Sequence, residues 1–203
     1  MAHTDRARLA ELLRERNEHP ERIPEIDEAI RAAFAVRAAV LVIDMAGFSR
    51  LSMRYGITHF LAMIRRMHDL VLPVIHDPVY GGHVFKAEAD NVFARFESPT
   101  RAVRAALAIR REVLRVNRVL PEDWDLYLGM GIGFGELLLL DAEDAFGNEM
   151  NLASKLGEDV AEPGQILLTE AAAEALEPGR FELLPRERHL GDHTIRYRAL
   201  LHG

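Results

Sequence analysis

The stretch that decides the fold reads Val40-Leu-Val-Ile-Asp44-Met-Ala-Gly-Phe-Ser49 and, after an apolar segment, Gly81-Gly-His-Val-Phe-Lys86-Ala-Glu-Ala-Asp90-Asn-Val-Phe-Ala-Arg-Phe96. Asp44 closes the apolar run 38–43, whose β-branched side chains favour a strand. Asp90 lies at the predicted turn between two further strands, residues 82–89 and 91–96. Two strand-end carboxylates that a fold brings together suit Mg²⁺, which takes oxygen ligands and often only one or two carboxylates plus substrate phosphates.

Composition narrows the classes of function. The 203 residues predict one domain, or one domain with an appendage, and the net charge of −7 argues against general binding of nucleic acids. The chain has no Cys, which excludes disulfides and thiolate chemistry. It has neither an apolar run of the ~20 residues that span a bilayer nor an apolar segment like that of a signal peptide at residues 1–6. We therefore expect a cytoplasmic protein.

Residues 1–34 predict a helical arm ahead of a domain at residues 35–203. One helix is expected within residues 1–19, and a second has Pro24 in its first turn. Helical apolar stripes are mostly packing surfaces, so we expect the arm to pack on the domain or on a second copy of the chain. A regulatory element is the alternative.

The remaining periodicity alternates helices with strands. Helices are predicted from Thr58 to about Ile75, from Ser98-Pro99 to about Asn117, from Asn151 to about Glu162, and at 170–176. A hairpin is predicted from strands 126–133 and 136–140, with Gly131, Gly133 and Gly135 permitting close backbone approach or a bulge. Short strands follow at 165–168, 181–184 and 194–200. This order predicts an α+β fold in which helices cover a sheet.

Three motifs in order carry a family resemblance. They are Ile43-Asp-x-x-Gly-Phe-Ser49, Lys86-x-x-x-Asp90 in a hairpin, and Phe146-Gly-x-x-x-Asn151-x-Ala-Ser154. From about Val36 to the C-terminus the chain resembles the class III nucleotidyl cyclases, the catalytic domain of adenylate and guanylate cyclases. The resemblance implies a ferredoxin-like βαββαβ core with extra C-terminal strands and helices.

The resemblance also implies a metal site. Asp44 and Asp90, with the backbone carbonyl of Met45, would hold two divalent ions, Mg²⁺ or Mn²⁺. One ion would lower the pKa of the ribose 3′-hydroxyl for attack on the α-phosphate, and the other would bridge the triphosphate. Without the resemblance, Asp44 reads as a helix N-cap.

Two residues are implied to read the base. Lys86 would donate to N1 of adenine and Asp144 would accept from the 6-amino group, a pair that favours ATP, whereas guanylate cyclases typically have Glu at the first position. Of 25 basic residues only Lys86 and Lys155 are lysine. Lys86 and Asp90 are expected on one strand and one face, with Cα atoms roughly 13 Å apart. A solvated Lys and a helix-capping Asp are the alternative interpretations.

Asn151 and Lys155 are four residues apart on a predicted helix and therefore share a face. The resemblance implies that Asn151 orients the ribose and that Lys155, where the family has Arg, stabilises charge on the phosphate. An ion pair of Lys155 with Asp159 is the alternative. Two other positions depart from the family pattern: Ala89 replaces the usual Gly before the second Asp, and the segment 188–191 lacks the Lys that binds terminal phosphates.

The sequence thus predicts an adenylate cyclase-like enzyme that converts ATP to 3′,5′-cyclic AMP and pyrophosphate. The active form is expected to be a head-to-tail homodimer with composite interfacial sites. Three alternatives stay open. The chain could cyclise GTP or a pyrimidine triphosphate, it could be a degenerate nucleotide-binding or dimerisation module, or it could be an unrelated ferredoxin-like binding domain.

Overall fold

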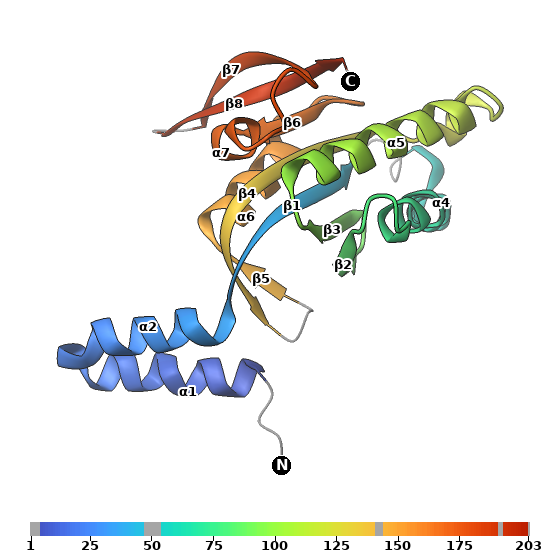
Figure 1. Cartoon of the computed structure of the whole chain (residues 1–203). Coiled ribbons are helices and arrows are strands. Elements are labelled where there is room, and N and C mark those ends of the chain that lie inside the picture. The colour runs from blue at the N-terminus through green and yellow to red at the C-terminus, as the bar shows by residue number, and fades with distance from the viewer. Residues whose placement is uncertain (1–4, 47–53, 141–143, 191–192, 203) are drawn as a thin grey trace.

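The computed structural model describes residues 5–46, 54–140, 144–190 and 193–202. Its centre is a βαββαβ unit: β1 (Ala35–Met45), α4 (Ile57–His76), β2 (His83–Glu88), β3 (Asn91–Phe96), α5 (Pro99–Asn117) and β4 (Leu128–Leu140). These strands lie in the order β2-β3-β1-β4, and all neighbours among them are antiparallel (Figure 1). The ferredoxin-like core that the resemblance implied is therefore confirmed.

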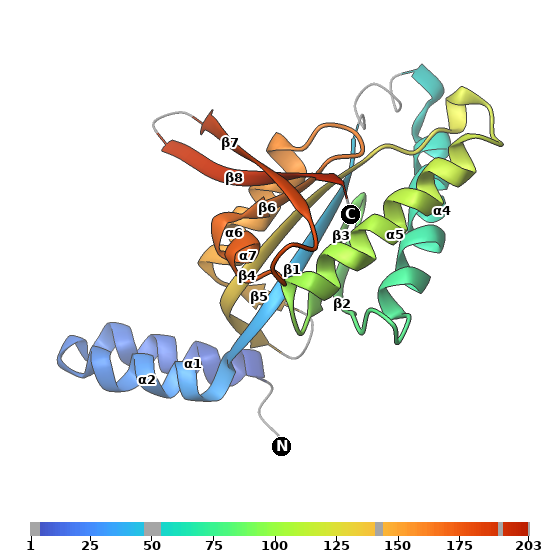
Figure 2. The same ribbon diagram turned by 45° about the horizontal axis from the view of Figure 1, so that its top comes forward.

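The C-terminal part extends the same sheet to eight strands. β5 (Asp144–Phe146) pairs with the end of β4, and β6 (Ile166–Thr169) runs parallel to the first part of β4, at residues 130–132. Between them lie α6 (Asn148–Ser154) and a π-helical segment, η3 (Lys155–Val160). After α7 (Glu170–Glu174), the hairpin of β7 (Glu182–Leu190) and β8 (His193–His202) joins the sheet through β8 and β6 (Figure 2).

Both faces of β1 are covered, which explains its uninterrupted apolar run. Ala39, Leu41 and Ile43 belong to the large core cluster with α4 and α5, whereas Val40 and Val42 belong to a second cluster with residues of β5 and α6. Successive side chains of a strand point to opposite faces. Asp44 therefore shares the face of Val40 and Val42, the face covered by α6.

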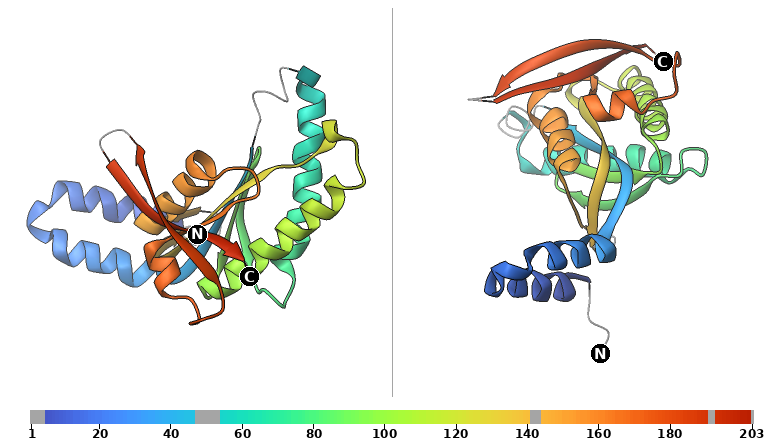
Figure 3. Two further views of the ribbon diagram at one scale, coloured as in Figure 1. Left: turned by 90° about the horizontal axis from the view of Figure 1, so that it is seen from above. Right: turned by 60° about the vertical axis from the view of Figure 1, so that its left-hand side comes forward.

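The arm is a helical hairpin at one end of the molecule (Figure 3). It consists of α1 (Asp5–Glu18), a short 3-10 turn η1 (Pro20–Arg22) and α2 (Ile23–Phe34), which leads directly into β1. The second helix buries Ile26, Ile30 and Phe34 in a small cluster with Leu140 of β4, whereas no residue of α1 is buried. Among the described residues, no helix combines the length and apolarity needed to cross a membrane.

The hairpin predicted at residues 126–140 is wrong. These residues form one continuous strand, β4, of which residues 128–138 pair with β1. The helix predicted from Thr58 begins one residue earlier, at Ile57 after Gly56, and Pro73 lies inside it. The Ser98 cap of α5 is confirmed, since its side chain accepts a hydrogen bond from the Arg101 N–H at 3.4 Å.

The glycines of β4 serve close approach to a helix. A Cβ on Gly131 would lie 2.0 Å from the Ala153 carbonyl oxygen, and one on Gly133 would lie 2.4 Å from the Glu149 carbonyl oxygen. The backbone of α6 therefore rests directly on the strand. Between β6 and β5 this edge of β4 lacks a strand partner, and the Glu149 carboxylate accepts a hydrogen bond from the Phe134 N–H there, at 3.1 Å.

Candidate active site

Asp44 and Asp90 lie at the same end of neighbouring strands. Asp44 is opposite Asn91 in the β1–β3 register, and the Met45 N–H donates to the Asp90 carbonyl oxygen at 3.2 Å. Both aspartates are half-buried, whereas the Met45 side chain is fully buried. The structure thus brings the predicted metal-binding carboxylates side by side. Residues 47–49 of the first motif lie outside the described residues.

The turn that presents Asp90 contains a strained residue. Ala89 has φ +50°, the one positive φ outside glycine in the described part of the chain. This conformation costs an L-residue with a Cβ roughly 1 kcal/mol or more. The Gly that the family uses at this position thus has a physical reason, and this chain keeps the turn without it.

Replacing Ala89 by Gly should therefore stabilise the fold. We expect the free energy of unfolding to rise by about 0.5–1 kcal/mol, because relief of the strain at residue 89 outweighs the entropy that the unfolded chain gains from the added Gly. Urea unfolding measures the change, and Ala87→Gly in the regular part of β2 is the matched control, expected to destabilise. Equal effects of both substitutions would contradict the strain at Ala89.

Negative charge gathers around Asp44. Burial raises the pKa of the Asp44 carboxyl to about 7, reinforced by Asp90 and then by Glu158 and Asp159. Burial and the neighbouring Asp159 likewise raise the pKa of Glu158. A cation bound here would stabilise the charged forms of Asp44 and Glu158, whose ionisation burial and neighbouring carboxylates oppose.

Sequence reasoning missed Glu158. It lies on η3, and this segment approaches the sheet through glycine: a Cβ on Gly157 would lie 3.1 Å from the Val42 carbonyl oxygen, two residues before Asp44. The signal in the sequence was a Gly inside a predicted helix. π-helical turns occur frequently at functional sites, and this one carries both Glu158 and the predicted phosphate-binding Lys155.

The donor set fits a cation that completes its shell from elsewhere. Within the described ranges, no group of three or more His, Cys, Asp or Glu side chains is arranged to hold a metal ion by itself. Mg²⁺ typically binds one or two carboxylates and retains water or substrate phosphate oxygens. The predicted ligands Asp44 and Asp90 would supply such a partial shell, and the charge of Glu158 acts on Asp44.

Lys86 and Asp144, the predicted base-reading residues, lie on two elements that contact one another, β2 and β5. Phe85 and Ala145 belong to one apolar cluster, and Lys86 and Asp144 are the adjacent residues. Their side chains are 41% and 29% exposed, and each is ion-paired within the chain: Lys86 with Glu88 at 3.1 Å and Asp144 with Arg6 at 3.4 Å. The prediction that Lys86 and Asp90 share one strand is wrong, because β2 ends at Glu88.

Asn151 and Lys155 are both exposed on the helix that rests on β4. Lys155 forms no ion pair with Asp159 among the described residues, so the alternative interpretation gains no support. Glu149, which sequence reasoning also missed, anchors this helix: its Oε2 accepts from the Phe134 N–H and from the Thr169 hydroxyl, the latter at 2.6 Å. The helix that presents Asn151 and Lys155 is therefore held in a defined position on the sheet.

The described residues of the C-terminal hairpin include basic side chains, and the predicted Arg alternatives to the missing Lys lie on β8. Arg198 forms an ion pair with Glu170 at 3.0 Å, and Arg196 is exposed opposite Glu187. Both line an open groove of about 500 Å³ together with Arg186. Gly191, which the family pattern places in this region, lies outside the described residues.

Known proteins with similar sequences and structures identify the family of this chain. No protein-family model matches the chain. The Rhizobium meliloti protein named "Putative adenylate cyclase 3" is 31% identical over 137 residues, which are 68% of this chain and 23% of that relative. An adenylate/guanylate cyclase/hydrolase structure from Silicibacter pomeroyi is 28% identical with a TM-score of 0.68, covering 82% of this chain and 95% of the other. The chain belongs to the class III nucleotidyl cyclase family.

The comparisons leave the nucleotide open. The guanylyl cyclase Cya2 superposes with a TM-score of 0.70 at 18% identity, covering 82% of this chain and 92% of the other, a likeness of fold alone. This class III chain also spans only about a quarter of the length of the Rhizobium meliloti relative. Two of its departures from the family pattern lie beside predicted site residues: Ala89 immediately precedes Asp90, and Lys155 follows Asn151 by one helical turn.

Proposed function

We propose that this class III chain converts ATP to 3′,5′-cyclic AMP and pyrophosphate. The observation that carries the proposal is the convergence of Asp44 and Asp90 at one sheet end, where burial and mutual repulsion raise the pKa of Asp44 to about 7. In this proposal Asp44, Asp90 and the Met45 carbonyl bind two Mg²⁺ or Mn²⁺ ions. When bound, these ions acidify the 3′-hydroxyl and offset charge on the departing pyrophosphate.

The other side chains bind and orient the nucleotide. Lys86 donates to N1 of adenine, and Asp144 accepts from the 6-amino group. Asn151 hydrogen-bonds to the ribose, and Lys155 places its positive charge beside the phosphate on which negative charge develops. These assignments rest on the family pattern, and what supports them is the position of each residue on an ordered strand or helix.

The proposed active form is a head-to-tail homodimer. Asn151 and Lys155 are exposed in the single chain, whereas electrostatic catalysis depends on a site from which water is largely excluded. A second copy covering this helix would supply that environment, and a two-fold arrangement would create two equivalent sites. Sedimentation should show a dimer at the concentrations at which the enzyme is active.

The experiment that tests the proposed function is an assay of four nucleoside triphosphates side by side. The purified chain is incubated with ATP, GTP, CTP or UTP and Mn²⁺, and cyclic nucleotide and pyrophosphate are both quantified. We expect ATP to be the preferred substrate. Preference for another triphosphate would show that the Lys86–Asp144 assignment is wrong, and binding without turnover in millimolar Mn²⁺ would indicate a degenerate module.

Lys155 offers a prediction on the rate. A lysine keeps the positive charge but lacks the planar fork by which Arg makes two parallel hydrogen bonds to phosphate oxygens. Lys155→Arg should therefore raise kcat roughly 3- to 10-fold with little change in KM, since a gain of about 1 kcal/mol corresponds to fivefold. Lys155→Ala should lower kcat by more than tenfold. An unchanged kcat in both variants would remove Lys155 from the reaction.

A further inference from the structure

Both residues assigned to adenine recognition are satisfied by partners within the chain. The Lys86 Nζ lies 3.1 Å from the Glu88 Oε2, and the Arg6 Nη2 lies 3.4 Å from the Asp144 Oδ2. Glu88 thus accepts where N1 of adenine would accept, and Arg6 donates where the 6-amino group would donate. The two contacts are independent, because Glu88 belongs to the same strand as Lys86 whereas Arg6 belongs to the arm.

We propose that Arg6 is an intramolecular competitor of the adenine edge, so that the position of the arm determines how readily the nucleotide binds. This inference rests on the proposed function, since it takes Asp144 as a base-reading residue. Arg6 acts through Asp144 and is a positioning residue, and the arm must release Asp144, at least locally, for the 6-amino group to take its place.

The seating of α1 makes such release possible. Whereas α2 buries three large side chains, α1 buries none. Its ion pairs, Arg16 with Asp27 of α2 and Glu15 with Arg22 of η1, lie toward the end of the hairpin remote from Arg6. Arg6 stands in the first turn of α1, and helix ends fray more readily than helix interiors. The contact with Asp144 is therefore made by the terminal turn of the arm.

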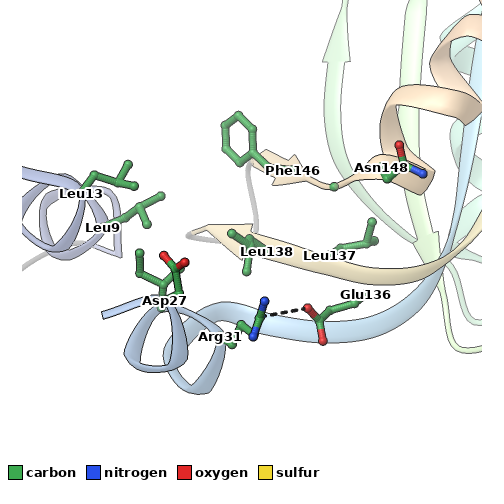
Figure 4. A pocket seen from close by; sticks show the side chains of 11 residues that line it. Leu9, Leu13, Asp27, Arg31, Glu136, Leu137, Leu138, Phe146 and Asn148 are labelled. Carbon is green, nitrogen blue, oxygen red and sulfur yellow. Dashed lines mark ion pairs between the residues drawn. The ribbon is translucent and has the colours of Figure 1, made fainter. Parts of the chain in front are cut away.

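A cavity separates α1 from the domain next to this contact. It has a volume of about 650 Å³ and lies between Leu9 and Leu13 of α1, α2, and Phe146, two residues after Asp144 (Figure 4). Leu13 and Phe146 remain 44% and 50% exposed. Leu9 and Leu12 still pack against the α2 cluster, although neither is fully buried, so we expect release of Asp144 to involve the first turn of α1 and to leave the main core intact.

The size of the effect follows from the exposure of the pair. Arg6 and Asp144 are 54% and 29% exposed, and exposed ion pairs contribute little. Arg6 should therefore weaken ATP binding about two- to fivefold rather than block it. The competition should also fade at high ionic strength, since salt screens exposed charges.

The test compares Arg6→Ala with Arg14→Ala, an exposed arginine on the same helix. We expect Arg6→Ala to lower the KM for ATP two- to fivefold with kcat unchanged, and Arg14→Ala to behave as the wild type. Arg6→Lys should lie between them. Raising the salt concentration should narrow the difference in KM between Arg6→Ala and the wild type. A raised or unchanged KM in Arg6→Ala would overturn the inference.

Hydrogen exchange in α1 separates this inference from the proposed function. In the nucleotide-free protein, Arg6→Ala and Asp144→Asn should both speed exchange in α1, and Arg14→Ala should not. ATP with Mn²⁺ should speed it in the wild type only. If the wild type cyclises ATP but the hydrogen-exchange rate of α1 does not change when ATP is added, the inference about Arg6 is wrong while the proposed function stands. If no triphosphate is turned over, the function fails, and slow exchange in both variants would exclude the contact as well.

Discussion

Asp44→Asn should lower kcat for cyclisation of ATP by at least about 1,000-fold, the largest loss expected of any single side chain in the site. The substitution preserves size and polarity but removes the charge that a hard divalent cation requires at the end of β1. Asp69→Asn, an exposed carboxylate on α4 paired with Arg65, is the matched control and should be silent. Activity within tenfold of the wild type would exclude Asp44 from the metal site.

The same substitution should stabilise the metal-free protein, although it abolishes activity. The pKa of Asp44 is raised from 3.8 to about 7 in the folded protein, so between these values the folded state binds more protons than the unfolded state. Stability from this group is therefore present at low pH and is lost as pH rises through 7. In chelator at pH 8, Asp44→Asn should be more stable than the wild type by roughly 1–3 kcal/mol, with the difference vanishing near pH 4.

Divalent cation should reverse that gain. Mn²⁺ binds the ionised Asp44 and stabilises the wild type by mass action, whereas the Asn variant lacks the ligand. Urea unfolding at pH 8, with chelator and then with millimolar Mn²⁺, measures both effects on one pair of proteins. An Asn variant that is less stable than the wild type in chelator at pH 8 would show that Asp44 is not held at a charged, buried position.

The order of the core elements could be predicted because each strand and helix has a local signature. The β1 run before Asp44, the Ser98 cap and the turn at Asp90 all depend on neighbours in the sequence. The error at β4 has the opposite origin. Alternating glycines there are compatible with a turn, whereas pairing with β1 and the packing of α6, which follows later in the chain, keep them in one extended strand.

The candidate site could be predicted in part for the same reason. Asp44 and Asp90 stand in motifs, but Glu158 reaches the site only because a π-helical turn and Gly157 bring η3 against the sheet. The contact of Arg6 with Asp144 joins residues 138 positions apart, on an arm whose packing no local pattern specifies. Interactions of this range depend on the whole fold, so they become visible only in the structure.

Gly131→Ala should be the most damaging change to the fold that leaves every proposed functional group in place. The added Cβ would lie 2.0 Å from the Ala153 carbonyl oxygen and 2.6 Å from the Gly157 nitrogen. Both are backbone atoms of the segment that carries Asn151, Lys155 and Glu158, so relief requires the whole segment to move. We expect a loss of about 3 kcal/mol or more in the free energy of unfolding and a large fall in kcat.

Gly135→Ala is the matched control on the same strand. Its Cβ would lie 2.8 Å from the Glu149 Cγ, so the Glu149 side chain, with its hydrogen bonds to Phe134 and Thr169, has to shift, whereas at Gly131 the backbone of α6 has to move. The control should therefore lose less than about 1.5 kcal/mol and retain most of its activity. Urea unfolding and the ATP assay on the two variants separate the effects. Equal losses would mean that α6 is not fixed by its backbone contact with β4, and the rigid presentation of Asn151 and Lys155 would then need another explanation.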